Sequence, residues 1–248
     1  MIHAPPPARG DRDMLVATYN VHRGRPPAGL FRPEGIARVI AEIRPDLIAL
    51  QEAQHYLRRD APMLDEDHLA SEAGLRSLRL HDRPREQGWR SNIVLIRRDA
   101  AVLRPPVGLR IGGLEPRGAI MAELDLGWGP FRLIATHLSL GAARRKRQGQ
   151  ALLAAMESGA GAGLPTVLVG DLNEWRAGAS VLGVLQAAFG TPPQVPTFPA
   201  FRPFLSLDRI MAHPPGMVAA VETHDTPLAR RASDHLPLKA RLSLPARA

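Results

Sequence analysis

The fold is decided by the stretch Thr166-Val167-Leu168-Val169-Gly170-Asp171-Leu172-Asn173, in which a short apolar run ends in two polar side chains. An apolar run of this length beside a glycine is typical of a buried β-strand. Asp171 and Asn173 are two residues apart, and on an extended segment such residues point to the same side. That spacing suits two groups that contact one small object, although on its own an Asp-Asn turn is the simpler interpretation.

The same arrangement recurs along the chain. Asn20 ends the apolar run 14–19, Glu52 follows the run 47–51, and Asp234-His235 precede another apolar stretch. Polar groups that recur where β-type runs stop tend to converge at one edge of a sheet. Carboxylate and amide groups together with an Asp-His pair are the components of metal-assisted hydrolysis of a phosphate ester.

Composition limits the class of protein. The 248 residues, 45% of them apolar, are enough for one large α/β domain or at most two small ones. We see no linker or repeat, so residues 14–248 are expected to form a single catalytic domain behind a flexible lead at 1–13. No apolar run approaches the roughly 20 residues that span a bilayer. The chain has no cysteine, which excludes thiolate metal ligands and is consistent with a cytoplasmic protein.

The net charge of +8 favours an anionic partner such as nucleic acid, phospholipid or a phosphorylated metabolite. Skewed genomic base composition explains an arginine-rich chain equally well. The only dense basic cluster is Arg144-Arg145-Lys146-Arg147. Aromatic residues make up 4% of the chain, which disfavours a stacking platform for single-stranded nucleic acid.

Strand-like patterns outnumber helical ones. Helices are predicted from Pro33 to Pro45 and over 65–74, 142–157 and 181–189. Strands are predicted over 15–20, 47–51, 78–80, 92–96, 120–126, 131–136, 166–169, 207–211, 217–221 and 236–242. Because helices do not alternate regularly with strands, two packed sheets with outer helices are favoured over a doubly wound fold.

Five motifs occur in a recognisable order along the chain. They are Thr18-Tyr19-Asn20-Val21-His22, Gln51-Glu52, Thr136-His137-Leu138, Gly170-Asp171-Leu172-Asn173 and Ser233-Asp234-His235. Together they resemble the endonuclease/exonuclease/phosphatase superfamily, which includes the deoxyribonuclease-I-like nucleases, and the sequence looks like a small bacterial member. The resemblance covers Leu15 to Leu242. It implies a four-layered α/β sandwich, in which two packed, mainly antiparallel sheets are flanked by helices and the site lies at one edge.

The resemblance also implies a metal side of the site, formed by Asn20, Glu52 and Asp234 around Mg²⁺ or Mn²⁺. A carboxylate at the end of a buried strand suits a hard divalent ion, although a nearby arginine could also be its partner. Asn20 could instead cap a turn. On the substrate side, the resemblance implies that Asp171 orients or deprotonates water and that Asn173 holds the phosphate.

The histidines complete the implied catalytic set. Asp208 matches the acid that orients His235, and His137 would contact the phosphate or assist the leaving group. Two phosphate contacts have weaker support. Asn92 lies in a segment where Ser91 replaces the usual glycine, and Arg117 could equally be a surface arginine. The role of His22, which follows Asn20 on the same face, is left open.

The sequence therefore predicts a Mg²⁺-dependent phosphoesterase, most simply a monomeric phosphodiesterase or nuclease-like hydrolase that works by in-line attack of an activated water. Its partner is a phosphodiester substrate, either DNA, a phospholipid head group or a small molecule. The alternative is a non-catalytic module that docks on nucleic acid or membrane. Such a module would be expected to lack at least one central group, and all are present: Asn20, Glu52, Asp171, Asn173, Asp208, Asp234 and His235.

Overall fold

The computed structural model describes residues 13–27, 29–55, 61–113, 115, 117–159 and 161–245. Residues 1–12 of the predicted lead lie outside the described residues. The first strand already begins at Asp13, one residue before the predicted domain boundary. Asp13 pairs with Ser243, so the strand extends one residue beyond the start of the apolar run 14–19.

The first sheet has seven strands in the order β11-β12-β1-β2-β5-β3, with β4 also paired to β5. Only the β1–β2 pair is parallel, and it brings Asn20 beside Gln51. The strands are β1 Asp13–Asn20, β2 Leu47–Gln51, β3 Leu75–Ser77, β4 Gly88–Trp89, β5 Asn92–Arg97, β11 Val218–Thr223 and β12 Leu238–Ser243.

The second sheet has five strands in the order β10-β9-β8-β7-β6, and β8–β9 is its one parallel pair. Its strands are β6 Ala101–Arg110, β7 Gly118–Asp125, β8 Pro130–His137, β9 Thr166–Asp171 and β10 Asp208–His213. The two sheets face each other around the largest core cluster, to which both contribute, as with Val16 and Ala49 from one and Val169 and Ile210 from the other.

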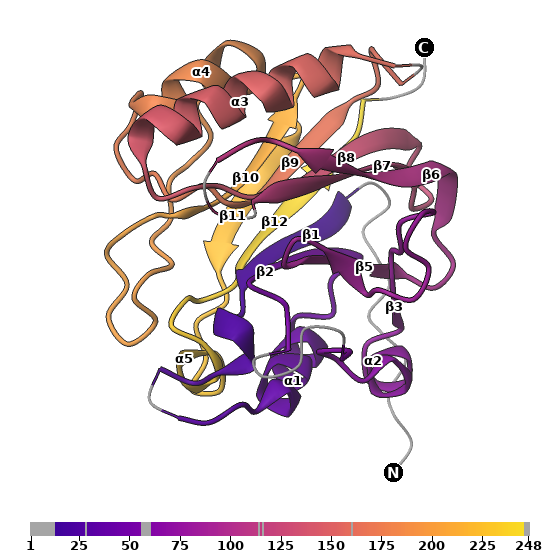
Figure 1. Ribbon diagram of the computed structural model, residues 1–248, viewed down its shortest axis with the longest axis vertical. Helices are drawn as coiled ribbons and strands as arrows, with labels where there is room; N and C mark the ends of the chain where they lie inside the picture. The colour runs from indigo at the N-terminus through magenta and orange to yellow at the C-terminus, as the bar shows by residue number, and fades with distance from the viewer. Residues whose placement is uncertain are drawn as a thin grey trace.

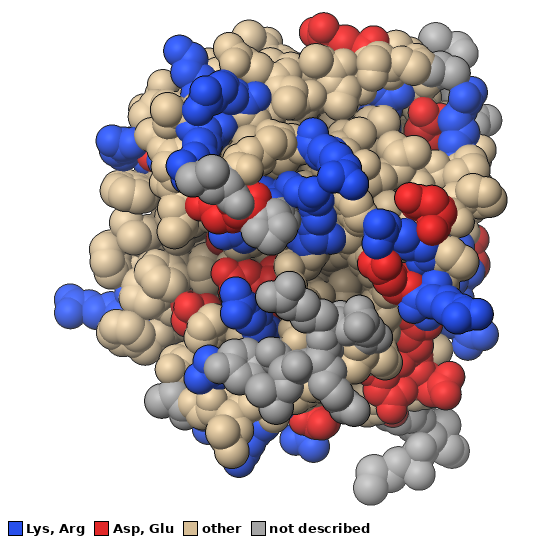
Figure 2. All heavy atoms as spheres, viewed as in Figure 1, with Lys and Arg blue, Asp and Glu red and all other residues tan. Residues whose placement is uncertain are grey.

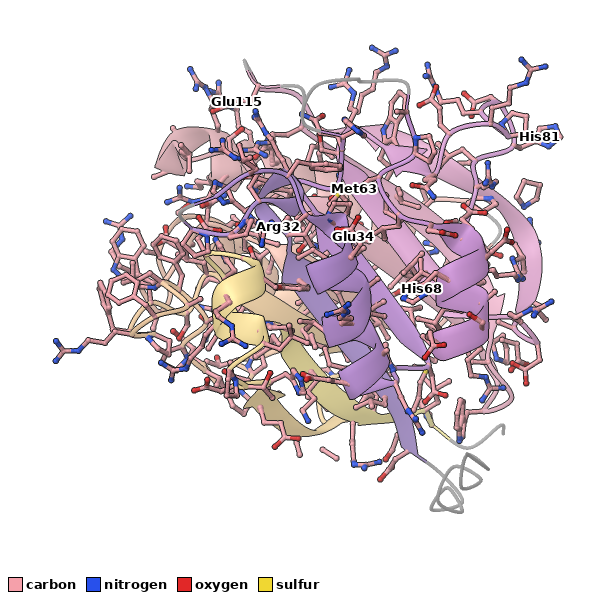
Figure 3. The ribbon with its side chains drawn as sticks, turned by 90° about the horizontal axis from the view of Figure 1, so that it is seen from below. Arg32, Glu34, Met63, His68, His81 and Glu115 are labelled. Atoms are coloured by element: carbon pink, nitrogen blue, oxygen red, sulfur yellow. The ribbon has the colours of Figure 1, made fainter. Side chains whose placement is uncertain are left out.

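Helices cover both outer faces (Figure 1). On the first sheet lie α1 Pro33–Ile43, α2 Glu66–Glu72 and α5 Ala229–Ala232, and on the second α3 Ala142–Glu157 and α4 Ser180–Phe189. Seen from below, α1 with Glu34 and α2 with His68 lie across their sheet (Figure 3). The predicted four-layered α/β sandwich is confirmed. Within the described ranges, every helix is too short or too polar to cross a membrane.

The helix α1 follows from local rules. Pro33 occupies the first turn, where its missing N–H costs no hydrogen bond. The predicted apolar stripe is buried, with Ile36, Val39 and Ile40 at 0% exposure. Arg44 then adopts a left-handed conformation before Pro45 and ends the helix.

One predicted strand lies elsewhere in the structure, and β4 and β6 were not predicted. The strand expected over 78–80 lies at Leu75–Ser77, where it pairs with β5, whereas Leu78 and Leu80 are buried in the core beyond the ladder. The long strand β6 was not predicted. It is an edge strand with an exposed first half and Pro105-Pro106 within it, so it shows neither an apolar run nor a clear alternation.

Candidate active site

Strand register brings three predicted residues together. Parallel pairing of β8 with β9 sets His137 against Asp171, and antiparallel pairing of β9 with β10 sets Asp171 against Asp208. Asn20 approaches from the other sheet, at the carboxyl end of β1. The site therefore lies at the edge where strands of both sheets end, as the sequence predicted for these positions.

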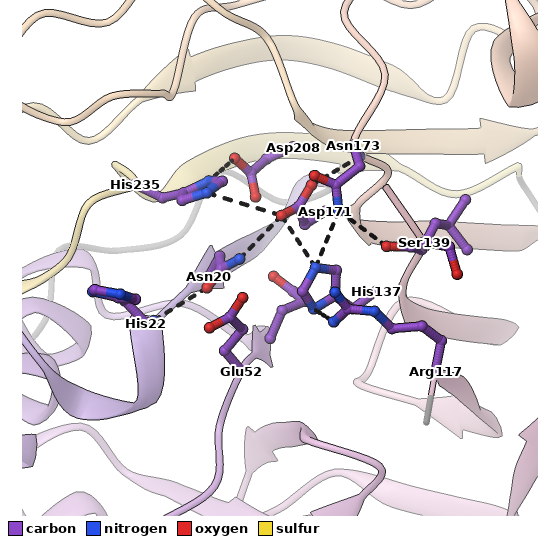
Figure 4. A network of polar contacts seen from close by, with 12 residues as sticks. Asn20, His22, Glu52, Arg117, His137, Ser139, Asp171, Asn173, Asp208 and His235 are labelled. Atoms are coloured by element: carbon purple, nitrogen blue, oxygen red, sulfur yellow. Dashed lines mark hydrogen bonds and ion pairs between the residues drawn. The ribbon is translucent and has the colours of Figure 1, made fainter. Parts of the chain in front are cut away.

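Asp171 is the centre of the resulting network (Figure 4). Its Oδ2 accepts a hydrogen bond from Asn20 Nδ2 at 3.0 Å and lies 3.4 Å from His137 Nε2 and 3.9 Å from His235 Nε2. Its side chain is almost fully buried. One carboxylate oxygen thus faces an amide and two imidazoles that come from three other segments of the chain.

Asn173 reaches this network through a turn. Its backbone N–H donates to Asp171 Oδ1 at 2.9 Å, and its own φ is 53°. The segment is therefore a turn and not extended as expected, although both side chains reach His137 Nε2, Asp171 Oδ2 at 3.4 Å and Asn173 Nδ2 at 3.2 Å. An aspartate side chain that accepts from the N–H two residues on closes a turn instead. Asn173 Nδ2 then donates to the Leu138 carbonyl at 3.0 Å, which holds the amide next to His137.

His235 is oriented as predicted. Its Nδ1 lies 2.9 Å from Asp208 Oδ2, and Thr197 Oγ1 donates to the same oxygen at 2.6 Å. Because a carboxylate only accepts, Nδ1 carries a proton and Nε2 faces Asp171. Burial lowers the pKa of His235, but the charges of Asp208, Asp171 and Asp234 outweigh it and raise the pKa to about 10. The ring is therefore an imidazolium at neutral pH.

His137 is held in the opposite state. Arg117 Nη1 lies 2.6 Å from His137 Nδ1, and a guanidinium only donates, so Nδ1 carries no proton. The single proton of the neutral ring is then on Nε2, which faces Asp171. Burial lowers the pKa of His137 to about 3, with Arg117 adding to the effect and Asp171 opposing it. His137 is therefore a hydrogen-bond donor that stays neutral.

Two of the three predicted metal ligands, Glu52 and Asp234, are partly exposed, whereas Asn20 is buried. Glu52 follows β2 with a positive φ of 52°, and its side chain is 27% exposed beside Asn20 (Figure 4). Asp234 is 32% exposed, and its neighbour Ser233 donates to the Asn20 carbonyl at 2.8 Å. The nearest basic group to Glu52 among the described residues is Arg23, whose Nε is 3.9 Å from the carboxylate.

This oxygen set fits a hard divalent cation, which prefers carboxylate, amide and water oxygens. A second group, Asp171, Asp208 and His235, also has its donor atoms within 4.8 Å of one another. Its nitrogen donor is protonated by the argument above, and Asp208 Oδ2 already accepts two hydrogen bonds. Asn20, Glu52 and Asp234 stay the predicted metal ligands, and their oxygen donors are of the kind that such a cation prefers.

Asn92 lies behind the site. Its side chain is buried, and Nδ2 donates to the carbonyls of Trp89, Arg90 and Gly118 at 3.2, 3.2 and 3.3 Å. The amide nitrogen thus joins the β4–β5 turn to the strand that follows Arg117. A phosphate contact by Asn92 stays a prediction that this geometry does not favour. Arg117, in contrast, reaches the site through His137.

His22, whose role the sequence left open, lies beside Asp234. It begins the short 3-10 helix η1 His22–Gly24, and its backbone N–H donates to Asn20 Oδ1 at 3.1 Å. Its ring Nδ1 is 3.2 Å from the Arg25 carbonyl and 3.9 Å from Asp234 Oδ1. The turn at His22 therefore fixes the Asn20 side chain from the metal side.

Sequence reasoning missed a buried ionic cluster beneath Asn173. Glu174 is fully buried and accepts a hydrogen bond from Arg145 Nη2 at 2.8 Å, while Arg209 Nη2 donates to the Glu174 carbonyl at 3.0 Å. The basic run Arg144–Arg147 is consequently divided, because Arg145 points inward. The sequence feature that could have revealed this cluster is the acidic residue directly after Asn173. Nothing comparable marks Thr197, which lies in a proline-rich loop.

The comparisons with known proteins agree with this geometry. The sequence pattern described as the Endonuclease/Exonuclease/phosphatase family matches residues 17–235. The chain therefore belongs to this family of metal-dependent hydrolases of phosphate esters. A search of curated protein sequences found no match.

Solved structures with the same fold span nearly the whole chain. An endonuclease/exonuclease/phosphatase from Bacteroides vulgatus has a TM-score of 0.71 at 17% identity, covering 94% of this chain and 99% of its own. The human Nocturnin catalytic domain with a bound sulfate anion has a TM-score of 0.64 at 18% identity, with 94% of each chain covered. A mannosyl-6-phosphatase from Bacteroides thetaiotaomicron has a TM-score of 0.65 at 16% identity, covering 93% of this chain and 100% of its own.

Proposed function

We propose that the protein is a Mg²⁺-dependent phosphodiesterase that cleaves its substrate by in-line attack of water. The observation that carries the proposal is the position of Asp171, whose buried Oδ2 lies among Asn20, His137 and His235. A carboxylate fixed in this way by neighbouring donors is positioned to accept a hydrogen bond from an attacking water. Water activation and binding of an anionic phosphate then occur within a few ångströms of each other.

Asn20, Glu52 and Asp234 would hold the metal, with Mn²⁺ as an alternative to Mg²⁺. When bound, the divalent ion neutralises negative charge on the phosphate and on the leaving group. Asn20 has a second task, because its amide nitrogen donates to Asp171 and its oxygen faces the metal side. It therefore aligns the carboxylate that activates water with the position of the phosphate.

The two histidines act on the phosphate in different ways. His235, kept cationic by Asp208, places a positive charge where negative charge develops in the transition state. His137, kept neutral by Arg117, donates from Nε2 without changing its charge. Asn173 adds an amide donor beside His137. These side chains supply a preorganised set of donors, which stabilises charge without moving during the reaction.

The substrate is the open part of the proposal. The fold is shared with a sugar-phosphate phosphatase and with a domain that binds sulfate, so phosphate monoesters belong in the substrate panel. The panel comprises nicked and abasic DNA, phospholipids, aryl phosphodiesters and aryl phosphomonoesters, each with and without Mg²⁺. Faster turnover of a diester than of the matched monoester supports a phosphodiesterase, and the reverse order contradicts it. A non-catalytic module would turn over none of them.

Glu52→Gln tests the metal assignment. The substitution keeps the shape of the side chain and removes its charge, so we expect turnover to fall by at least about a hundredfold, since metal stabilisation of phosphate charge contributes several kcal/mol. Stability should change little because this side chain is partly exposed. Steady-state kinetics over a Mg²⁺ titration measures the effect. Glu222→Gln, at an exposed carboxylate paired with Lys239, is the matched control. Near-normal turnover of Glu52→Gln at saturating Mg²⁺ would show that the metal is held elsewhere.

A further inference from the structure

The described residues expose eight large apolar side chains, and their distribution is uneven. Three lie on the edge strand β6, as Val102, Leu103 and Val107. The other five lie in loops, four of them in loops that carry or contact candidate-site residues, and we call the five the apolar rim: Leu30, Leu140, Trp175, Phe201 and Phe204. Such a gathering around one opening is a sign of a binding surface rather than of scattered surface residues.

The rim residues belong to the loops that carry the site. Leu140 comes three residues after His137, and Trp175 two residues after Asn173, with exposures of 69% and 47%. The two loops are joined through the buried Arg145, which donates to the Leu140 carbonyl and to Glu174. The rim on this side is therefore fixed to the same scaffold as the site.

The other side of the rim lies next to Asp234. The loop between Phe198 and Leu205, closed by a bridge between these two residues, carries Phe201 and Phe204 at 71% and 67% exposure. Its Ala200 N–H donates to the Asp234 carbonyl at 2.7 Å. The orange segment that joins α4 to β10 extends from the left of the ribbon in Figure 1. The site thus opens between two groups of exposed apolar side chains.

The segment that carries Trp175, Phe201 and Phe204 is basic in sequence, with Arg176 also paired to the buried Glu174. Between Glu174 and Asp208 the chain contains no acidic residue, and its charged residues are Arg176 and Arg202. Arg202 lies between Phe201 and Phe204, and the Arg176 guanidinium lies 5.5 Å from the Trp175 ring centre. Figure 2 shows mostly uncharged side chains with projecting basic ones at the left margin of the molecule.

We propose that the apolar rim docks the open edge of the sandwich on an anionic lipid bilayer. Aromatic and aliphatic side chains enter the boundary between head groups and acyl chains, while arginines beside them meet lipid phosphates. Single-stranded nucleic acid fits less well, because stacking needs rings and Leu30 and Leu140 offer none. Docking in this pose turns the candidate site toward the phosphodiesters of the head groups. That last consequence rests on the proposed function, whereas the docking itself does not.

Vesicle binding without turnover tests the surface alone. The full chain is sedimented with vesicles of phosphatidylcholine plus phosphatidylglycerol, and with vesicles of phosphatidylcholine only, in the presence of a chelator. We expect binding to the anionic vesicles that weakens as salt is added. The double variant Phe201→Ser/Phe204→Ser should bind them at least about tenfold more weakly, since each ring loses its burial in the lipid. Both side chains are exposed, so circular dichroism should show an unchanged fold.

Matched measurements distinguish the outcomes. Leu103→Ser, on β6 at 47% exposure, removes an exposed apolar side chain away from the rim and should bind vesicles as the wild type does. Vesicles should also shift the tryptophan emission to the blue, and Trp175→Phe should remove most of that shift. The proposal is overturned if anionic vesicles are not bound, if the double variant binds them normally, or if that variant loses affinity for a single-stranded oligonucleotide instead. Vesicle binding with no turnover of any phosphate ester supports the docking proposal and contradicts only the proposed function.

Discussion

Two histidines only a few ångströms from the same carboxylate oxygen are held in opposite protonation states. His235 has a carboxylate behind it and His137 a guanidinium, at 2.9 Å and 2.6 Å from the respective Nδ1 atoms. Burial lowers the pKa of both rings, but the carboxylates of Asp208, Asp171 and Asp234 outweigh it at His235, whereas Arg117 adds to it at His137. Asp171 therefore lies between a positively charged ring, His235, and a neutral hydrogen-bond donor, His137. Each protonation state leads to a measurable consequence.

Asp208→Asn should disable His235. The amide keeps the size of the side chain but removes the charge that raises the pKa of the imidazole, so the ring becomes neutral and the tautomer is no longer fixed. We expect turnover to fall by roughly a thousandfold or more, as for other carboxylate–histidine pairs, and by a similar factor in His235→Ala. The double variant should be little worse than either single one. If the two losses multiply in steady-state kinetics, the residues act separately.

His137 should make the protein sensitive to acid. In the unfolded chain its pKa is about 6.5, and in the folded protein it is about 3. Between these values only the unfolded chain binds the proton, so stability from this group is present above about pH 6.5 and is lost as the pH falls toward 3. Comparison with His137→Gln by urea unfolding isolates the effect. The stability difference between wild type and variant should decrease by roughly 2 kcal/mol from pH 7 to pH 5.

The control for this measurement is His68→Gln, at an exposed position on α2. Its stability difference from wild type should stay constant over the same pH range. An unchanged difference for His137→Gln would mean that His137 takes up a proton in the folded state. The assignment of His137 as a neutral hydrogen-bond donor would then be wrong.

At the scale of elements, the close contact of β8 with β9 depends on Gly170. Its φ is 145°, and a methyl group added there would lie 1.8 Å from the Thr136 carbonyl oxygen. This glycine allows the two parallel strands to end side by side, with His137 against Asp171. The pairing of His137 with Asp171 therefore depends on Gly170 having no side chain.

Gly170→Ala should cost about 3 kcal/mol or more of the free energy of unfolding, because it combines an unfavourable φ with a clash against backbone. Gly35→Ala is the matched control, since this helical glycine has an ordinary φ and its nearest contact for an added methyl is Ala232 Cβ at 3.7 Å. It should be neutral or stabilise by about 0.5–1 kcal/mol. Denaturant unfolding compares the two. Equal losses would mean that the strands can move apart at Gly170.

Two neighbouring arginines of α3 should behave very differently. Arg145→Gln leaves the buried Glu174 carboxylate with only the largely exposed Arg176 as an ionic partner among the described residues, so we expect a loss of about 3 kcal/mol of stability. Arg144, whose Nη1 is 3.9 Å from Glu115, is partly exposed, and Arg144→Gln should change stability by no more than about 0.5 kcal/mol. Thermal or urea unfolding of both variants distinguishes a buried ionic anchor from surface charge. Similar losses in the two would contradict the inward position of Arg145.

At the scale of the whole molecule, the sequence predicted more of the site than of the scaffold. Residues at strand ends, such as His137 and Asp171, could be expected to lie together because strands of one sheet share their edges. The edge strand β6 could not, because exposure removes the apolar pattern that marks a strand. Thr197 could not either, since its contact with Asp208 depends on how a long loop folds back rather than on any local signal.

The central position of β1 has a consequence for the time at which activity can arise during synthesis. This first strand lies between β2 and β12, and its residues 13–18 pair with 243–238, which are made last among the strands. Ser233, from the same late segment, donates to the Asn20 carbonyl. A chain still on the ribosome therefore holds Asn20, Glu52 and Asp171 without the partners that align them. We therefore expect the proposed hydrolysis to begin only after β12 has emerged and paired with β1.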